Sequence, residues 1–265
     1  MNGVRHFLLA LQFFTRVPVT GPLAGWVGFS PAMLRASAAH FPGVGWLVGG
    51  VGAGVLWFAQ AGLPGVAGAL AAAALSTIAT VLMTGAFHED GLADVADGLG
   101  GSADRARALE IMKDSRIGAF GAIALVLALG LKIVLLATLI GQGAWTASVA
   151  LLSAHVLSRL APLFLIRWLP YVGDENAASK AKPLAAAIGS GALMVGVAWS
   201  IPAAALLLWS HGAQHGLAAL LLCALAAMWT ARLLMRRLQG FTGDGLGATQ
   251  QVCELAIYLA LAWHA

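Results

Sequence analysis

Apolar residues form long runs along this chain, and short polar connections separate the runs. Runs that could cross a membrane lie at 43–59, 66–87, 118–140, 145–166, 184–209, 216–235 and 251–263. A transmembrane helix needs about 20 mostly apolar residues, so the first six runs suffice, and the last, which is short, is expected to be tilted or partly inserted. The pattern predicts an all-α fold, a polytopic membrane helical bundle of about six to seven transmembrane helices.

The N-terminus carries a shorter apolar segment. Arg5 and the run Phe7–Phe14 resemble the start of a secretion signal, but Arg16 closes the run and no cleavage site with small residues follows. We therefore expect residues 4–17 to lie at the membrane surface as an interfacial helix. No linker or soluble segment of domain size is visible, so residues 1–265 are expected to form a single integral membrane domain.

The first apolar run contains two pairs of glycines four residues apart, Gly45 with Gly49 and Gly50 with Gly54. This small-xxx-small spacing lets two helices approach closely in lipid. A generally glycine-rich composition explains the spacing equally well, so the sequence leaves both interpretations open.

Charge is scarce and unevenly placed. Only 10% of the residues are charged and 60% are hydrophobic, whereas soluble proteins average about 25% charged residues. The connections 60–65, 141–144 and 210–215 contain no Lys, Arg, Asp or Glu. The segments that alternate with these connections along the chain carry nearly all of the charged residues. By the positive-inside rule, these charged segments are expected in the cytoplasm: the N-terminus and the loops 88–116, 167–183 and 236–250. The net charge of +4 thus marks orientation in a bacterial inner membrane and predicts no nucleic-acid partner.

The densest group of charged side chains follows the second apolar run directly. On a helix, Asp90, Asp94 and Asp97 would fall within about 60° of one another. Carboxylates on one stripe repel each other, and a divalent cation removes that cost. Oxygen ligands without cysteine favour Mg²⁺ or Mn²⁺, so these residues, with Glu89 beside them, are candidate metal ligands. The alternative is a solvated acidic loop at a helix end.

Other side chains near this segment are candidates for acid–base chemistry or phosphate binding. His88 is a candidate base or metal ligand, although an interfacial histidine with neither role is as reasonable. Asp114, a further candidate ligand, lies between Lys113 and Arg116, which suit phosphate oxygens or merely mark orientation.

Three more charged residues stand apart from that loop. Arg16 lies among aromatic residues, and Asp244 lies in a glycine-rich turn whose backbone could approach phosphate. Arg159 lies inside the fourth apolar run, where a charge calls for a partner or a function, or for snorkelling. Lys132, in the third run, is expected to pair with Glu254 or another buried acid, or to snorkel outward.

Acidic residues beside Lys and Arg at one membrane face indicate metal-dependent phosphoryl transfer on an amphiphilic or large substrate. A cation-coupled transporter is the opposing class. Transporters place ionisable groups near mid-span, often within inverted repeats, and no such repeat is evident here. The residues alone therefore favour a phosphotransferase.

Four motifs together resemble the cobalamin synthase (adenosylcobinamide-GDP ribazoletransferase) family. They occur in the order Phe13-Phe14-Thr15-Arg16-Val17-Pro18-Val19, Phe87-His88-Glu89-Asp90-Gly91-Leu92-Ala93-Asp94 with Asp97-Gly98, Met112-Lys113-Asp114-Ser115-Arg116-Ile117-Gly118, and Gly240-Phe241-Thr242-Gly243-Asp244. The resemblance covers nearly the whole chain, and its two central motifs are the specific ones.

The resemblance implies a membrane enzyme that joins adenosylcobinamide-GDP to α-ribazole, or to its 5′-phosphate, and releases GMP, with Mg²⁺ as cofactor. Segment 88–117 would be the cytoplasmic catalytic loop. Membrane lipid would surround the bundle, and assembly into a homo-oligomer stays open. The resemblance implies three sets of site residues. The metal ligands would be Glu89, Asp90, Asp94, Asp97 and Asp114, and the catalytic groups would be Asp94, Asp97 and His88. The phosphate or substrate contacts would be Arg16, Lys113, Arg116, Arg159 and Asp244.

A second family is kept as the alternative. The run Asp94-Val95-Ala96-Asp97-Gly98 also resembles the D-x-x-D-G of CDP-alcohol phosphotransferases, which transfer lipid head groups in a helical membrane bundle. The rest of that family's pattern is not matched in this chain.

Overall fold

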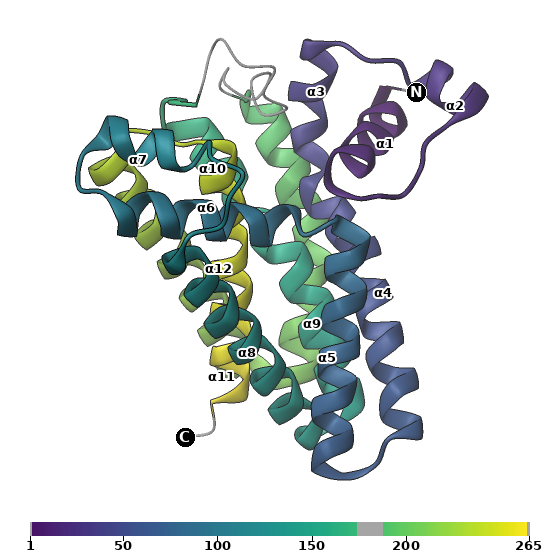
Figure 1. Ribbon diagram of the computed structural model, residues 1–265. Helices are drawn as coiled ribbons and strands as arrows, with labels where there is room; N and C mark the ends of the chain where they lie inside the picture. Colours follow the sequence, from purple (N-terminus) through teal and green to yellow (C-terminus); the bar gives the residue numbers. More distant parts are fainter. Residues whose placement is uncertain (1, 174–187, 264–265) are drawn as a thin grey trace.

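The computed structural model describes residues 2–173 and 188–263, and this part of the chain is built from helices (Figure 1). The helices in chain order are α1 (Asn2–Phe14), α2 (Gly21–Val27), α3 (Pro31–Ser37), η1 (Ala38–His40), α4 (Phe41–Gly62), α5 (Gly65–Thr84), α6 (Phe87–Gly101), α7 (Arg105–Ile111), α8 (Ala119–Gln142), α9 (Ala144–Ser158), α10 (Ala161–Trp168), α11 (Ser190–Leu238) and α12 (Gly243–Ala262). The expected cytoplasmic loop 167–183 lies outside the described residues from 174 onward. The predicted all-α membrane bundle is confirmed.

Within the described ranges, five helical stretches are long and apolar enough to cross a membrane. They are Pro31–Gly62, Gly65–Thr84, Ala119–Gln142, Ala144–Trp168 and Ser190–Leu238. The first begins earlier than the predicted run because α3 and η1 lead directly into α4. The last predicted run, 251–263, lies in α12, which is not among the five stretches. Helix α12 packs beside α8 in the bundle (Figure 1).

The longest helix, α11, supplies two of the predicted spans. Its 49 residues exceed what one crossing of a bilayer needs. At Gly212 the backbone leaves the helical region, with φ 76° and ψ 162°. The two arms then pack together, since a Cβ on Gly216 would lie 3.1 Å from the Cα of Leu208. The uncharged connection around residues 210–215 is therefore a tight reversal within one helical element.

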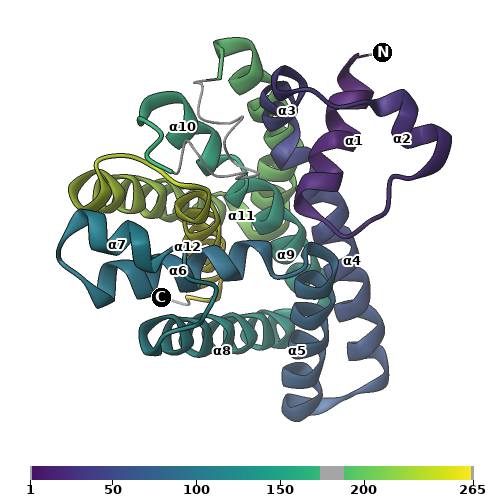
Figure 2. The ribbon, with the colours of Figure 1, turned by 45° about the horizontal axis from the view of Figure 1, so that its top comes forward.

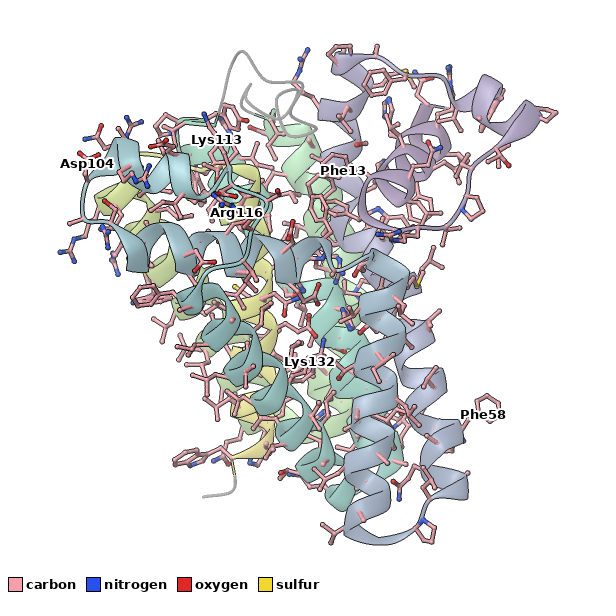
Figure 3. The ribbon with its side chains drawn as sticks, in the orientation of Figure 1. Phe13, Phe58, Asp104, Lys113, Arg116 and Lys132 are labelled. Carbon is pink, nitrogen blue, oxygen red and sulfur yellow. The ribbon has the colours of Figure 1, made fainter. Side chains whose placement is uncertain are left out.

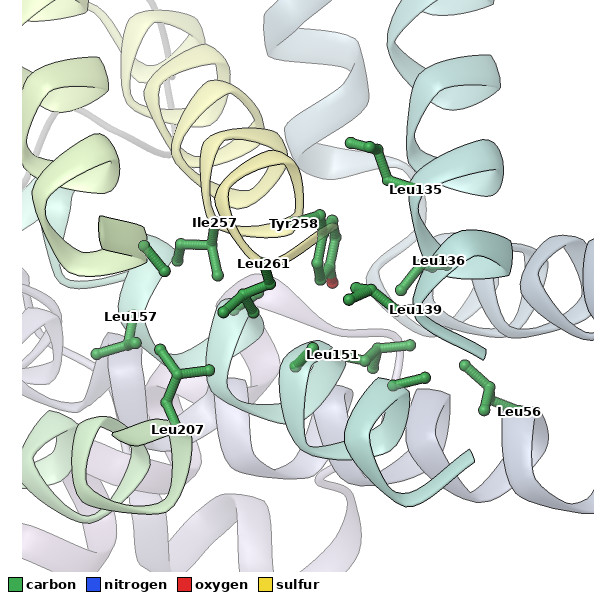
Figure 4. Packing of buried hydrophobic residues seen from close by; sticks show 14 of the residues in the cluster. Leu56, Leu135, Leu136, Leu139, Leu151, Leu157, Leu207, Ile257, Tyr258 and Leu261 are labelled. Atoms are coloured by element: carbon green, nitrogen blue, oxygen red, sulfur yellow. The ribbon is translucent and has the colours of Figure 1, made fainter. Parts of the chain in front are cut away.

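The main apolar core lies where α4, α5, α8, α9, α11 and α12 meet. Figure 4 shows part of it: leucines of α8 face Tyr258 and Leu261 of α12 and Leu151 of α9. Leu136, Leu139 and Tyr258 have no exposed surface. The opposite surface of the bundle carries exposed apolar side chains such as Phe58 (Figure 3), as expected for helices that face lipid.

Glycines of α4 let α9 approach its backbone. A Cβ on Gly45 would meet the carbonyl oxygen of His155, and it would lie 2.7 Å from the Cα of Val156. A Cβ on Gly49 would lie 2.9 Å from the Cα of Leu152. A Cβ on Gly50 or Gly54, the other glycine pair, would have no atom of the described residues within 4 Å. Close helix packing therefore explains the first pair.

We expect Gly45→Leu to destabilise the protein by roughly 1–3 kcal/mol or more, because the larger side chain must push two backbones apart. Gly50→Leu is the matched control on the same helix, with free space around its Cβ. Thermal unfolding in detergent measures the difference between the variants. Equal loss of stability in both would contradict the assigned contact.

Candidate functional site

Helix α6 lies across one end of the bundle and is not a spanning helix (Figures 1 and 2). Two consecutive left-handed residues, Gly85 (φ 67°) and Ala86 (φ 59°), turn the chain sharply from α5 into α6. Leu92 and Ala96 face an apolar cavity of about 330 Å³ between α6, α11 and α12. The face of α6 opposite to these two residues is therefore the one that can carry polar chemistry.

Asp90 and Asp94 occupy that opposite face, as the helical period requires. Asp90 is exposed and Asp94 is half-buried. The first turn of α12 brings Asp244 beside them, since a Cβ on Gly91 would lie 2.8 Å from the carbonyl oxygen of Asp244. The structure thus unites an acid from the late glycine-rich turn with two acids of α6.

The three carboxyl groups interact electrostatically. Burial, followed by the charges of Asp244, Asp90 and Asp97 in that order, raises the pKa of Asp94 to about 7. A carboxyl with so high a pKa lacks a nearby cation to stabilise its charged form. The cluster of Asp90, Asp94 and Asp244, called the acid cluster below, therefore attracts a cation.

Asp97 has a different environment from the other two acids of the stripe. Its Oδ2 accepts a hydrogen bond from the Gly118 amide (2.7 Å), and its Oδ1 accepts one from the Gly121 amide (2.8 Å). These amides are at the start of α8, where a negative charge also stabilises the helix dipole. A Cβ at either glycine would collide with the Asp97 carboxylate. Asp97 therefore joins α6 to α8.

Glu89 and His88 point into the protein. Glu89 is buried, and its Oε1 accepts a hydrogen bond from Gln251 of α12 (3.0 Å). His88 is buried and stacks on Phe14, with 5.4 Å between ring centres. It borders a cavity of about 20 Å³ that Arg159 also lines. Burial, then the charge of Arg159, lowers the pKa of His88 well below its usual value, so the ring is neutral.

The loop after α7 brings its cations to the same end of the molecule as α6. Figure 3 shows Lys113 and Arg116 there. Arg116 is exposed, and its Nη2 lies 2.6 Å from Oδ2 of Asp114. Hydrogen bonds from Arg116 lower the pKa of Asp114 to about 2. In this conformation the Asp114 carboxylate therefore pairs with Arg116. Lys113, the residue before Asp114, is exposed.

Arg16 lies beside the turn that leads from α5 into α6. Its backbone amide donates to the Met83 carbonyl (2.8 Å), and its exposed side chain passes over Gly85, where a Cβ would contact the guanidinium. Because Gly85 directly precedes the turn into α6, Arg16 is placed near the first residues of that helix. The cations of two distant segments thus lie at the same end of the molecule as α6.

Arg159 and Lys132 lie inside the bundle. Arg159 is 2% exposed, and its Nη1 donates to both Nδ1 (3.0 Å) and the carbonyl oxygen (2.8 Å) of His155. Lys132 Nζ lies 2.6 Å from Oε1 of Glu254. Of the alternatives that the sequence left open for Lys132, the structure shows the pairing with Glu254. His155 was not predicted from the sequence as a partner of Arg159, although its position four residues earlier places both on one helix face.

The glycine-rich turn before α12 is held by backbone bonds. The Phe241 amide donates to the Pro170 carbonyl (2.9 Å), and the Val172 amide donates to the Phe241 carbonyl (2.9 Å). Thr242 then caps α12, because its Oγ1 accepts from the Gly245 amide (3.0 Å). These contacts fix where Asp244 leaves the turn.

The acid cluster has the donor chemistry that Mg²⁺ prefers, namely carboxylate oxygens without sulfur or imidazole. Burial, and then the charges of Asp244, Asp90 and Asp97, raise the pKa of Asp94, so a bound cation would stabilise its charged form. In the described ranges no three His, Cys, Asp or Glu side chains are already arranged as a metal shell. Binding one ion between Asp90, Asp94 and Asp244 therefore requires changes of side-chain rotamer.

Comparisons with known proteins agree on one family. The family model described as cobalamin-5-phosphate synthase matches residues 6–262. The chain is 58% identical to the adenosylcobinamide-GDP ribazoletransferase of Albidiferax ferrireducens, over 98% of each chain. It is 43% identical to the protein of that name from Ralstonia nicotianae, over 99% of this chain and 96% of the relative. No significant match was found among solved structures.

Proposed function

This chain belongs to the cobalamin-5-phosphate synthase family, and from that premise we propose that it transfers the adenosylcobinamide phosphate group of adenosylcobinamide-GDP to α-ribazole or α-ribazole 5′-phosphate. The acid cluster on α6 and α12 is the observation that carries the proposal, and it lies at the same end of the bundle as Arg16, Lys113 and Arg116. It provides a place for a charged pyrophosphate beside an apolar scaffold.

The reaction is a substitution at phosphorus. A ribose hydroxyl of α-ribazole attacks the phosphorus on the cobinamide side, and the bond from that phosphorus to the bridging oxygen breaks. GMP leaves with the bridging oxygen, and the hydroxyl proton passes to a base. We assign the base to a carboxylate at the acid cluster, because His88 is buried against Phe14.

We propose Mg²⁺ as the cofactor, held by Asp90, Asp94 and Asp244. When bound, the ion would neutralise charge on the pyrophosphate and on the departing GMP. Glu89, Asp97 and Asp114 are left out of this set because each already bonds to a protein group. Their bonds shape the site around the ion instead.

The flanking cations would bind the phosphate oxygens that the acids do not face. Arg16 lies near the start of α6, and Lys113 and Arg116 follow α7. Arg116 can exchange Asp114 for a substrate phosphate at little cost, because an exposed ion pair contributes little. Arg159 is too deeply enclosed by His155 to share this role without rearrangement.

We propose that the site faces the cytoplasm of the inner membrane. Arg5, Arg16 and Arg35 at the N-terminus and Arg236 and Arg237 before α12 support this orientation by the positive-inside rule. Lipid would contact the exposed apolar faces of the bundle. A homo-oligomer remains compatible with the same surface.

The activity can be tested directly with the purified chain in lipid nanodiscs. We expect adenosylcobinamide-GDP and α-ribazole to yield equal amounts of GMP and the joined product, by mass spectrometry. Chelation of Mg²⁺ should stop the reaction, and added Mg²⁺ should restore it. Release of a nucleotide only from a CDP-alcohol and a lipid acceptor would instead support the second family.

The raised pKa of Asp94 predicts a pH dependence of metal binding. Protons and Mg²⁺ compete for the same carboxylate, so the Mg²⁺ concentration for half-maximal activity should fall as the pH rises from 6 to 8. Without metal, the folded protein binds the Asp94 proton more tightly than the unfolded chain does. The resulting contribution to the free energy of unfolding is lost as the pH rises through about 7. Activity titrations and thermal unfolding at each pH measure both effects, and a flat metal response would contradict the assignment.

A further inference from the structure

A chain of buried side chains ties α6 to the interior of the bundle. Gln251 Nε2 donates to Glu89 Oε1 (3.0 Å) and to Gln250 Oε1 (3.0 Å). Gln250 Nε2 donates in turn to Glu254 Oε2 (2.7 Å) and to Ser158 Oγ (2.9 Å). A continuous hydrogen-bonded path thus runs from α6 through two successive amides of α12 to a carboxylate inside the membrane-spanning region.

A lysine, a tyrosine and a histidine surround the inner end of this path. Lys132 of α8 pairs with Glu254 at 2.6 Å, and both side chains are at most 2% exposed. The Tyr258 hydroxyl donates to Glu254 Oε1 (3.0 Å), and His155 Nδ1 lies 3.6 Å from Glu254 Oε2. Side chains from α8, α9 and α12 therefore fix one orientation of the Glu254 carboxylate.

Packing alone does not call for these groups. Charges inside a membrane bundle are costly and usually functional, and a buried ion pair seldom adds more stability than apolar side chains of the same volume. Directional bonds of this kind do specify one arrangement of the groups they join. Here such bonds join Glu89 of α6 to Gln251 and Gln250 of α12.

The start of α6 has few other polar attachments. Ala86, at its N-cap, makes no side-chain cap bond, and of the two Glu89 oxygens Oε2 has no partner in the part of the chain described. The far end of α6 is held separately, by Asp97 and by Arg237, whose Nη2 donates to the Ser102 carbonyl (2.6 Å). The bond from Gln251 is therefore the polar attachment of the first turn.

We propose that Gln251 and Glu254 are positioning residues for the acid cluster. The Lys132–Glu254 pair orients the two glutamine amides, and Gln251 then holds Glu89. Because a helix is rigid over one or two turns, holding Glu89 also aims the neighbouring Asp90 and Asp94 toward Asp244. This inference deepens the proposed function and rests on the acid cluster as the metal site.

The test uses the purified full chain in detergent with Mg²⁺ alone. In Gln251→Met, we expect amides in the first two turns of α6 to exchange hydrogen for deuterium faster, while those near Asp97 stay unchanged. The Kd for Mg²⁺, followed by thermal shift, should rise roughly 10-fold or more, as found when groups that orient metal ligands are removed. Ser153→Ala is the control, since Ser153 is buried in the same bundle and bonds to Ala203 of α11 rather than to α6.

An exchange of the two partners separates positioning from direct coordination. The double variant Glu89→Gln with Gln251→Glu rebuilds a hydrogen bond with its donor reversed, and we expect slow α6 exchange and Mg²⁺ affinity to recover in part. Unchanged exchange of α6 in Gln251→Met, or faster exchange with unchanged Mg²⁺ affinity, would overturn the proposal. Lack of ribazole transfer by the unaltered chain would instead count against the proposed function, since neither readout needs the substrates.

Discussion

Asp94→Asn is expected to lower turnover roughly 100- to 1,000-fold, the loss typical when a charged group aimed at the reacting centre is neutralised. Asp94 lies between Asp90, Asp97 and Asp244, and its pKa of about 7 reflects burial and their charges. The amide has nearly the same shape, so α6 should pack as before. GMP release at saturating substrates, measured across Mg²⁺ concentrations, gives the effect on kcat and on metal affinity separately.

Asp104→Asn is the matched control for this experiment. Asp104 is an exposed acid that caps α7 by accepting from the Arg107 amide (2.8 Å), and asparagine caps helices equally well. The turnover of Asp104→Asn should stay within about twofold of that of the unaltered chain, since this substitution does not change the charge at the acid cluster. If Asp94→Asn were as active as Asp104→Asn, the metal site at the acid cluster would be excluded.

Lys132→Met is expected to lower the free energy of unfolding by roughly 3–5 kcal/mol, because it leaves Glu254 buried without its closest cation. The lysine is 1% exposed and lies in the middle of the bundle (Figure 3). Methionine fills nearly the same volume, so the loss comes from charge and not from a cavity. Unfolding in mixed detergent micelles measures it.

Removing the second charge should restore much of that stability. In Lys132→Met with Glu254→Gln, the glutamine still offers an oxygen to the Tyr258 hydroxyl but carries no unpaired charge. Thr138→Val, also on α8 but exposed, controls for polar-to-apolar change on that helix. A double variant no more stable than Lys132→Met alone would show that the pair is not the source of the loss.

The outcome for Asp97 and Asp244 shows what spacing can and cannot predict. Helical periodicity correctly placed Asp90, Asp94 and Asp97 near one stripe of a helix. Which neighbour each would meet depended on segments far along the chain. Gly118 and Gly121 leave room for Asp97 to bond to the start of α8, and Gly91 leaves room for the turn that carries Asp244. Neither contact could be predicted from α6 alone.

The sequence by itself determined that this protein is an all-α membrane bundle, because lipid accepts only long apolar helices with satisfied backbones. It also determined the family, through motifs that stand in order along the chain. Only the tertiary structure decided that α11 (Ser190–Leu238) folds back at Gly212, that Lys132 meets Glu254, and that Glu89 points inward while Asp90 and Asp94 lie on another face of α6. The physical reason is that a sequence pattern sets the direction of a side chain around its own helix, whereas packing between distant helices decides what lies in that direction.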